Sequence, residues 1–393
     1  MVFETESFVE LDFSSVSRIL ASSGLQVDSE VEVYNAANKW LSHNMEERCK
    51  FAKQLLLKVR LNLLSEQTLK HLINKSSCIF KNEECLKVLK NRDSLYEDNS
   101  FIPNNSRHCN QSKFNIMICG GRDRSSNIVG EVREFDVNNL QVKTLPALVD
   151  QKERFVAVYN KGEVYVFGGF DTKNLLRSVE KYSPVSKTWN YVCDLPDDRQ
   201  YFCGCAFMDK IYLFGGDCLN FENLKDSLQF DTKQLKWDQI TRKNEGIRNE
   251  ACSVFEGNIV VCGGINENFL STNKVESYDV FSDTWTQMPS MIERRSRHNL
   301  VNFKSKLFVI GGKDSGIKCE VFDKTSNRFI ALKTPELKYL FMKAYLIGSK
   351  LFILQHGTNK IICYDVCKNK WSEEQCEVMK NIKYCSTVKI PLY

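Results

Sequence analysis

The chain has 393 residues, of which 42% are hydrophobic and 26% charged, the balance of a globular protein rather than of a disordered or fibrous one. Its formal net charge of +5 is small for this length and argues against a nucleic-acid partner, which requires a concentrated basic face. No apolar run is long enough to span a membrane, and the acidic first residues do not resemble a signal peptide, so we expect a cytoplasmic protein without a membrane partner.

The first part of the chain, residues 1–90, is predicted to be a domain of antiparallel helices. Apolar residues recur at helical spacing in four stripes: Val33, Ala36, Ala37, Trp40 and Leu41; Phe51, Leu55, Leu56 and Val59; Leu69, Leu72 and Ile73; Cys85, Leu86 and Leu89. Glycine is nearly absent here, and no proline occurs before Pro103. The polar stretch 91–113, which contains that proline and several asparagines, is predicted to be a linker.

The remainder, residues 114–393, contains an internal repeat. Short apolar runs end in glycine pairs every 47 or 48 residues, at Gly120-Gly121, Gly168-Gly169, Gly215-Gly216, Gly263-Gly264 and Gly311-Gly312. A sixth run, 350–354, ends in Gln355-His356-Gly357 instead. Apolar runs of this length between turn residues are typical of buried strands, and a fixed period of this size is typical of a repeat architecture.

A second feature of the repeat is an aromatic residue followed seven positions later by another large apolar residue. The pairs are Tyr182 with Trp189, Phe230 with Trp237, Tyr278 with Trp285, Phe322 with Phe329 and Tyr364 with Trp371, and Phe135 with Val142 is a weaker first copy. We expect each pair to lie on the two outer strands of one small sheet and to pack against the next sheet. The sequence therefore predicts a mainly β protein, a six-bladed β-propeller preceded by an all-α domain.

The ends of the repeat region predict how the ring closes. The inner copies have a strand before the glycine strand, as in 202–207, but the segment before Phe114 is polar. The segment 384–390 after the last tryptophan is strand-like and has no partner in its own copy. We expect it to complete the first blade, because closure of this kind removes an exposed sheet edge.

Cysteine and histidine usage gives no indication of a cofactor or a metal site. Sixteen cysteines in a long chain without a signal peptide are expected to be reduced thiols, several of them in apolar strands, such as Cys119, Cys262 and Cys363. The chain lacks a CxxC pair, and its five histidines are scattered, so we expect no zinc site. Nucleophile-elbow, P-loop, zincin and dinucleotide-binding motifs are also missing, so we expect no enzyme.

The repeat resembles the kelch repeat, and residues 25–30 with Trp40, Arg48 and 59–61 resemble the BACK domain. Together they resemble the kelch-like (BTB-BACK-kelch) family, although we find no BTB domain and expect the BACK-like part to lack its first helices. The resemblance implies a non-enzymatic adaptor that captures a protein substrate with the propeller. In such proteins the missing parts form the dimer and the main contact with a cullin-3 ubiquitin ligase scaffold.

The resemblance also implies partner contacts at two loop positions per blade, one just after the glycine pair and one about fourteen residues before it. The first set is Arg122, Phe170, Asp217, Ile265 with Asn266, and Lys313. The second set is Arg154, Tyr201, Asn249, Arg297 and Phe341, with Tyr384 for the first blade. The cations of both sets, with the neighbouring Arg248, Arg294 and Arg295, favour an acidic peptide segment as partner.

Three interpretations of function stay open from the sequence. The first is a substrate adaptor that reaches cullin-3 through a BTB-containing partner. The second is a scaffold that binds actin or another filament, as some kelch proteins do. The third is a shortened form that binds substrate without delivering it. Some related propellers are copper radical oxidases, but the scattered histidines argue against a site of that kind here.

Overall fold

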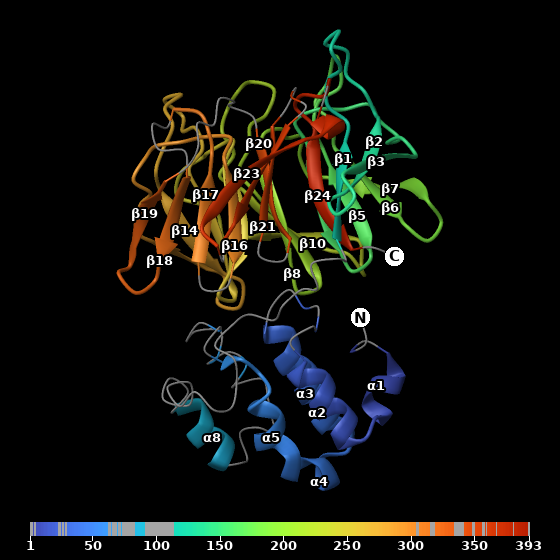
Figure 1. Cartoon of the computed structure of the whole chain (residues 1–393), viewed down its shortest axis with the longest axis vertical. Helices are drawn as coiled ribbons and strands as arrows, with labels where there is room; N and C mark the ends of the chain where they lie inside the picture. Colours follow the sequence, from blue (N-terminus) through green and yellow to red (C-terminus); the bar gives the residue numbers. More distant parts are fainter. Residues whose placement is uncertain are drawn as a thin grey trace. The chain divides into compact units, whose positions relative to one another are not determined.

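The computed structural model describes residues 3, 5–22, 25, 27, 30–61, 64, 69, 72, 83–90, 114–303, 306–314, 319–333, 342–347, 350–355, 358, 360–366, 368–379 and 381–391. They form two compact units, one helical and one made of six β-sheets (Figure 1). The predicted linker 91–113 lies outside the described residues, so the domain boundaries 1–90 and 114–393 stay predictions. None of the described helices is long and apolar enough to cross a membrane.

The first predicted apolar stripe lies on a helix of the helical unit, whereas Ile73 of the third stripe lies outside the described residues. The elements of this unit are α1 (Glu6–Glu10), α2 (Phe13–Ala21), α3 (Glu30–His43), α4 (Met45–Arg48), the 3-10 helix η2 (Cys49–Phe51), α5 (Ala52–Leu56) and α8 (Glu83–Lys90). All five residues of the first stripe lie in α3 and are buried, which confirms that face as core. Helix α2 begins where the Asp12 carboxylate accepts a hydrogen bond from the Ser15 N–H at 2.8 Å, a standard N-cap.

Trp40 is at the centre of the helical core. Its indole N–H donates to the Leu11 carbonyl at 2.8 Å, and the Arg48 guanidinium lies 4.2 Å from the centre of its ring. Arg48 also donates to the Val9 carbonyl at 2.7 Å. The tryptophan and the arginine of the resemblance therefore connect α3 and α4 to the end of α1 and to the turn that follows it, in a site where the cation and the ring attract each other.

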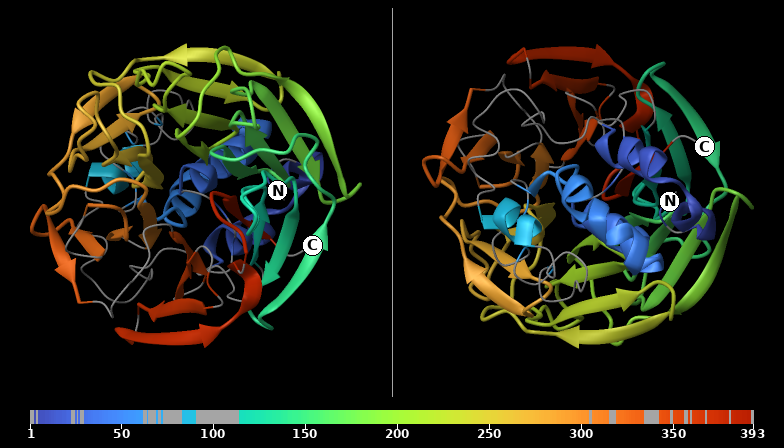
Figure 2. Two further views of the ribbon diagram at one scale, coloured as in Figure 1. Left: turned by 90° about the horizontal axis from the view of Figure 1, so that it is seen from above. Right: turned by 90° about the horizontal axis from the view of Figure 1, so that it is seen from below.

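The larger unit is a ring of six four-stranded antiparallel sheets, seen along its axis in Figure 2. In order from the inner strand outwards, blade 1 is β24 (Ser386–Pro391), β1 (Phe114–Cys119), β2 (Val132–Asp136) and β3 (Gln141–Leu145), and blade 2 is β4 (Val156–Asn160), β5 (Glu163–Phe167), β6 (Ser178–Ser183) and β7 (Thr188–Asp194). Blade 3 is β8 (Cys203–Phe207), β9 (Lys210–Phe214), β10 (Ser227–Asp231) and β11 (Lys236–Ile240), and blade 4 is β12 (Ala251–Phe255), β13 (Asn258–Cys262), β14 (Val275–Asp279) and β15 (Thr284–Gln287). Blade 5 is β16 (Asn299–Phe303), β17 (Lys306–Ile310), β18 (Cys319–Asp323) and β19 (Arg328–Leu332), and blade 6 is β20 (Met342–Ile347), β21 (Lys350–Gln355), β22 (Lys360–Asp365) and β23 (Lys370–Gln375), followed by the 3-10 helix η5 (Glu377–Met379).

Blade 1 is built from both ends of the repeat region. Strand β24 pairs antiparallel with β1 from Phe114 opposite Pro391 to Cys119 opposite Ser386. The two strands lie side by side in Figure 1. This pairing gives β1 an inner neighbour, so the edge that the polar segment before Phe114 would leave open is covered.

The aromatic pairs of the repeat lie where the sequence predicts them. Phe230 is directly opposite Trp237 in the β10–β11 pairing, and their ring centres are 4.6 Å apart. Trp237 also packs edge-on against Phe167 of the preceding blade, at 5.9 Å. The indole N–H groups of Trp189, Trp285 and Trp371 each donate to a backbone carbonyl of the preceding blade. The pairs therefore join neighbouring blades, as repeat folds require.

Buried cation–glutamate pairs fix the segments that lead into the inner strands. Lys152 pairs with Glu180 in blade 2 at 2.6 Å, and Arg295 pairs with Glu320 in blade 5. All four side chains are fully buried. Each glutamate also accepts two successive backbone N–H groups just ahead of its cation: Val149 and Asp150 for Glu180, Ile292 and Glu293 for Glu320. These segments carry several of the predicted partner-contact residues.

The cysteines that the structure describes are all free thiols. Cys119, Cys262 and Cys363 are buried in strands, as the sequence predicts. Burial raises the pKa of the Cys363 thiol to about 11, so this group is protonated at neutral pH and behaves as a small apolar core residue.

Candidate partner-binding surface

The second set of predicted contact residues forms a ring at one end of the propeller axis. Residues Arg154, Tyr201, Asn249, Arg297 and Tyr384, here called the inner ring, each lie just before the inner strand of a blade. The Tyr201 N–H donates to the Arg154 carbonyl, the Asn249 N–H to the Tyr201 carbonyl and the Arg297 N–H to the Asn249 carbonyl, at 2.7 to 3.3 Å. Successive blades are therefore joined residue to residue around the axis. Phe341, the sixth predicted member, lies outside the described residues.

All five inner-ring residues have a left-handed backbone, with φ between 55° and 60°. None of them is glycine, so each carries the steric cost of a side chain in this region. The conformation recurs at the same position in five blades, so it is a regular feature of the repeat rather than an isolated irregularity. It presents five side chains of alternating cationic, aromatic and amide character at the axis.

The first set of predicted residues is brought next to the inner ring. The residue before each inner-ring member forms a β-bridge with the residue after a glycine pair: Glu153 with Phe170, Gln200 with Asp217, Arg248 with Ile265, Ser296 with Lys313, and Lys383 with Arg122. The two bridged positions lie 17 residues apart in the sequence in four of these blades and 261 residues apart in blade 1, and they meet in space. The structure therefore gathers both sets at one end of the propeller.

Arg122 and Arg154 share the carboxylate of Glu153. Arg122 holds it with two hydrogen bonds of 2.6 and 2.8 Å, and Arg154 lies 3.0 Å from it. Glu153 is fully buried, and its bonds raise the pKa of Arg122 above the ordinary value. Arg154 also donates to the side-chain oxygen of Gln200 at 3.1 Å. The sequence analysis did not predict Glu153 and Gln200 as part of this surface. Only their position directly before an inner-ring residue could have indicated them.

Two guanidinium groups of the inner ring contact the aromatic rings of Tyr201 and of the neighbouring Phe170. The Arg154 guanidinium lies 5.2 Å from the centre of the Phe170 ring and 5.1 Å from that of Tyr201. The Arg297 guanidinium lies 5.7 Å from the centre of the same Tyr201 ring. A guanidinium that stacks on a ring can still form a hydrogen bond, as Arg154 does with Gln200, and an ion pair, as it does with Glu153, so a group of this kind can hold a carboxylate. Burial raises the pKa of Tyr201, so its hydroxyl stays neutral.

Two charged residues that the sequence analysis assigned to the partner surface, Asp217 and Arg295, are buried. Asp217 is fully buried and accepts from Arg248 at 2.6 Å, so it positions Arg248 and does not itself face a partner. Burial raises the pKa of Asp217, while the Arg248 charge opposes that effect. Arg295 is fully buried in its pair with Glu320 and adds nothing to the surface charge.

The other predicted residues occupy different positions on the loops. The Asn266 side-chain oxygen accepts from the N–H groups of Asn268 and Leu270, both at 3.1 Å, so it shapes the β13–β14 loop. Lys313 is exposed, whereas Arg122, Phe170 and Ile265 are half-buried. The sequence reading missed the exposed apolar tips of two loops, Leu219 with Phe221 and Phe269 with Leu270. Among the described residues, no cluster of histidine, cysteine and carboxylate side chains is placed to hold a metal ion.

His298, the neighbour of Arg297, gives a testable pH dependence. Its Nε2 lies 3.2 Å from the Cys262 sulfur, and burial together with the Arg295 charge lowers the pKa of His298 from 6.5 to about 3. Below pH 6.5 the His298 imidazole becomes protonated in the unfolded chain but stays neutral in the folded protein. The free energy of unfolding therefore falls as the pH falls. Between pH 6.5 and about 4.5 we expect the free energy of unfolding of wild type to fall by about 2–3 kcal/mol more than that of His298→Gln.

Urea unfolding at a series of pH values measures this difference. His43→Gln is the matched control, because His43 is exposed at the end of α3 and its replacement should leave the wild-type profile unchanged. Parallel profiles for wild type and His298→Gln would show that the buried imidazole does not resist protonation.

Comparison with known proteins agrees with this architecture. Residues 106–312 match the model of the KLHDC2/KLHL20/DRC7 Kelch-repeats domain, and residues 1–74 match the BACK (BTB And C-terminal Kelch) model. Kelch-like protein 7 of Rattus norvegicus is 27% identical over 386 residues, which cover 94% of this chain and 65% of the relative. Kelch-like protein 7 of Homo sapiens is 27% identical over 80% of this chain and 54% of its own length.

Kelch-like protein 35 of Mus musculus is 24% identical over 93% of this chain and 56% of the relative. The chain thus spans between about half and two thirds of the length of these relatives. The Kelch-repeats match covers more than half of the chain and extends over the observed propeller from β1 to the end of β17 in blade 5. The chain therefore belongs to the kelch-like family, with a BACK domain followed by a kelch-repeat propeller.

Proposed function

We propose that this protein recognises a protein substrate with the inner-ring end of its propeller and acts as a substrate adaptor of a cullin-3 ubiquitin ligase, without enzymatic activity of its own. The observation that carries the proposal is the contact of the Arg154 and Arg297 guanidinium groups with the rings of Phe170 and Tyr201. Arg154, Tyr201 and Arg297 all have a strained, left-handed backbone. Arginine and aromatic anchors of this kind dominate binding energy at protein interfaces. Membership of the kelch-like family supports the protein-binding role.

The charges at this surface favour an acidic segment as the recognised element. The carboxylates of Glu153 and Asp217 are buried behind the arginines that they hold. The more exposed Asp123 and Asp171 accept backbone N–H groups within their own turns, at 2.6 to 2.8 Å. A partner carboxylate would therefore meet guanidinium donors first, and such charge-assisted bonds are the strong ones.

The helical unit supplies the second part of the proposal. Because a BACK domain accompanies BTB domains in this family, we assign the link to cullin-3 to a BTB-containing partner or segment. The described cysteines are all free thiols, which agrees with a reducing compartment and supports a cytoplasmic location.

The test compares proteins recovered from cells with the full chain and with the double variant Arg154→Ala/Arg297→Ala. We expect the variant to recover the substrate at least about tenfold less well, because two guanidinium groups are lost from one ring. The matched control is Arg242→Ala/Arg328→Ala, which removes two exposed arginines outside the inner ring and should change nothing. Quantitative mass spectrometry of the recovered proteins measures the effect.

Each outcome decides between interpretations. Cullin-3 in the wild-type sample together with loss of one substrate in the variant supports the adaptor. Equal recovery by wild type and variant would show that the inner ring is not the recognition surface. Recovery of actin or other filament proteins alone would replace the adaptor with the cytoskeletal scaffold.

A further inference from the structure

Four exposed apolar side chains gather on the loops of two adjacent blades. Leu219 and Phe221 lie on the β9–β10 loop of blade 3, and Phe269 and Leu270 lie on the β13–β14 loop of blade 4. Their exposed fractions are 57%, 62%, 67% and 55% in that order. We call these four residues the apolar rim. Exposed apolar residues are ordinary when they stand alone, but four of them on two loops that contact each other favour an interaction site.

The two phenylalanines are held in an unfavourable backbone conformation. Phe221 and Phe269 have φ of 59° and 60°, and each donates its N–H to a carbonyl three residues earlier at 3.0 Å. Blade 1 forms the same turn with Ser126, at φ 65°. Glycine or asparagine suits this position best, and a bulky residue there is a marked outlier. Because both rings are exposed, burial of apolar surface does not offset the cost of this backbone conformation.

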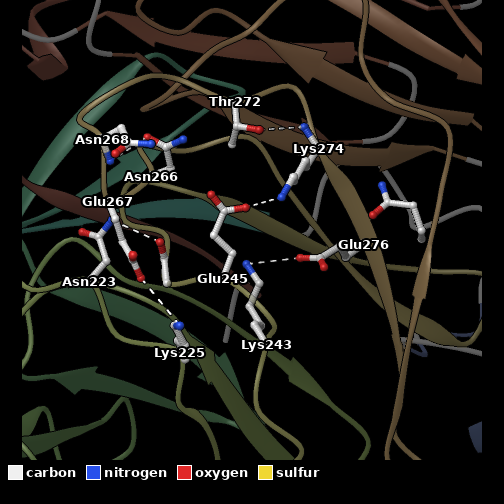
Figure 3. Close-up of polar contacts among 12 residues, drawn as sticks. Asn223, Lys225, Lys243, Glu245, Asn266, Glu267, Asn268, Thr272, Lys274 and Glu276 are labelled. Atoms are coloured by element: carbon white, nitrogen blue, oxygen red, sulfur yellow. Dashed lines mark hydrogen bonds and ion pairs between the residues drawn. The ribbon is translucent and has the colours of Figure 1, made fainter.

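The loops that carry the apolar rim are fastened to each other. The Asn223 side-chain amide donates to the Ile265 carbonyl at 3.0 Å and to the Gly246 carbonyl at 3.1 Å. Lys225 and Glu267 form an ion pair of 3.7 Å across the same gap, which Figure 3 shows as a dashed line between the two loops. A surface that is ordered before binding loses less entropy when a partner binds.

The apolar rim is continuous with the inner ring through Arg248. Its guanidinium lies 5.1 Å from the centre of the Phe269 ring and is fixed by Asp217 at 2.6 Å. Arg248 directly precedes Asn249, which the inner-ring hydrogen bond joins to Tyr201. One extended segment can therefore contact the cationic part and the apolar part at the same time.

We propose that the apolar rim binds a large apolar or aromatic side chain of the same partner segment whose carboxylate the inner ring binds. The recognised element is thus bipartite, an acidic residue and an apolar residue on one short stretch of chain. This inference rests on the proposed function and adds the second half of the specificity. Apolar contact supplies affinity that does not depend on salt, while the arginines select the charge.

The test uses a phage library of random dodecapeptides selected on the immobilised full chain. Wild type should enrich peptides with an acidic residue and an aromatic or large aliphatic residue at a recurrent spacing. Phe221→Asn/Phe269→Asn should lose the apolar preference and bind the selected peptides about tenfold or more less tightly, and asparagine at positive φ should keep the loops folded. Leu235→Asn is the matched control, because Leu235 is another exposed apolar residue at positive φ, on the β10–β11 turn.

The outcomes separate this inference from the proposed function. Enrichment of acidic peptides without an apolar position, or binding by Phe221→Asn/Phe269→Asn equal to that of wild type, would contradict the proposed role of the apolar rim. Either result would leave the proposed role of the inner ring intact. An apolar preference that survives Arg154→Ala/Arg297→Ala, with no acidic position, would overturn the acidic partner instead. A dimer in light scattering that becomes a monomer in Phe221→Asn/Phe269→Asn, without a change in peptide binding, would assign the rim to self-association. No enrichment on wild type would overturn both.

Discussion

Glu320→Gln is expected to lower the free energy of unfolding by about 3–5 kcal/mol, because it leaves the fully buried Arg295 without its counter-charge. The substitution keeps the size of the side chain, but its one amide oxygen can replace only one of the two carboxylate oxygens that accept the Ile292 and Glu293 N–H groups. The loss therefore reports the charge and one backbone hydrogen bond, and not a cavity. Urea unfolding followed by tryptophan fluorescence measures it.

Two further variants interpret that result. Arg295→Met/Glu320→Gln removes both charges and should recover most of the lost stability, because a buried pair contributes little relative to apolar residues of similar volume. Glu373→Gln breaks the half-exposed pair with Lys360 and should cost less than about 1 kcal/mol. A loss for Glu320→Gln as small as that of Glu373→Gln would mean that Arg295 reaches water.

Gly216→Ala is expected to destabilise the propeller by about 4 kcal/mol. The glycine has φ 98°, and a Cβ atom there would lie 2.6 Å from the Gln200 carbonyl oxygen. That oxygen cannot retreat freely, because it accepts a hydrogen bond from the Asp217 N–H at 2.9 Å. Backbone strain and steric overlap therefore add, and the loops that carry Tyr201 and Asp217 should shift.

Gly130→Ala is the matched control for that substitution. Its Cβ would meet its nearest neighbour at 3.5 Å, an ordinary contact, and its φ is not in the left-handed region. A compatible alanine restricts the unfolded chain, so we expect no loss and a gain of up to about 1 kcal/mol. Thermal unfolding of both variants checks the contrast, and similar melting temperatures would contradict the role of the glycine pair.

The fold could be predicted from the sequence because its signals are local. Each glycine pair follows a strand directly, and the partners of each aromatic pair lie seven residues apart, so Phe230 and Trp237 become opposite residues of one hairpin. The helical stripe of α3 depends on spacing within a single element in the same way. Such features need no knowledge of distant contacts.

The candidate site could be predicted only in part, because the burial of a loop side chain depends on contacts between blades. From the sequence, both Asp217 and Arg248 were predicted to lie near the surface. In the structure Asp217 is fully buried and holds the guanidinium of the less buried Arg248. Arg295 looks like a surface arginine in the sequence, but it is buried against Glu320, which lies 25 residues later, and against the Gly311 carbonyl. Charge alone does not tell which member of a pair faces water.

The sequence by itself determined the six blades and the strand that closes the ring, since these follow from a repeat of 47 or 48 residues and from the segments at its two ends. The loop positions that meet at the axis were implied by the kelch resemblance. Only the tertiary structure decided which side chains those loops present. The left-handed backbone of the inner ring, the shared carboxylate of Glu153 and the apolar rim across blades 3 and 4 arise where residues of neighbouring repeats touch. Those contacts depend on how the twisted sheets pack around the ring, and no local pattern in the chain encodes that geometry.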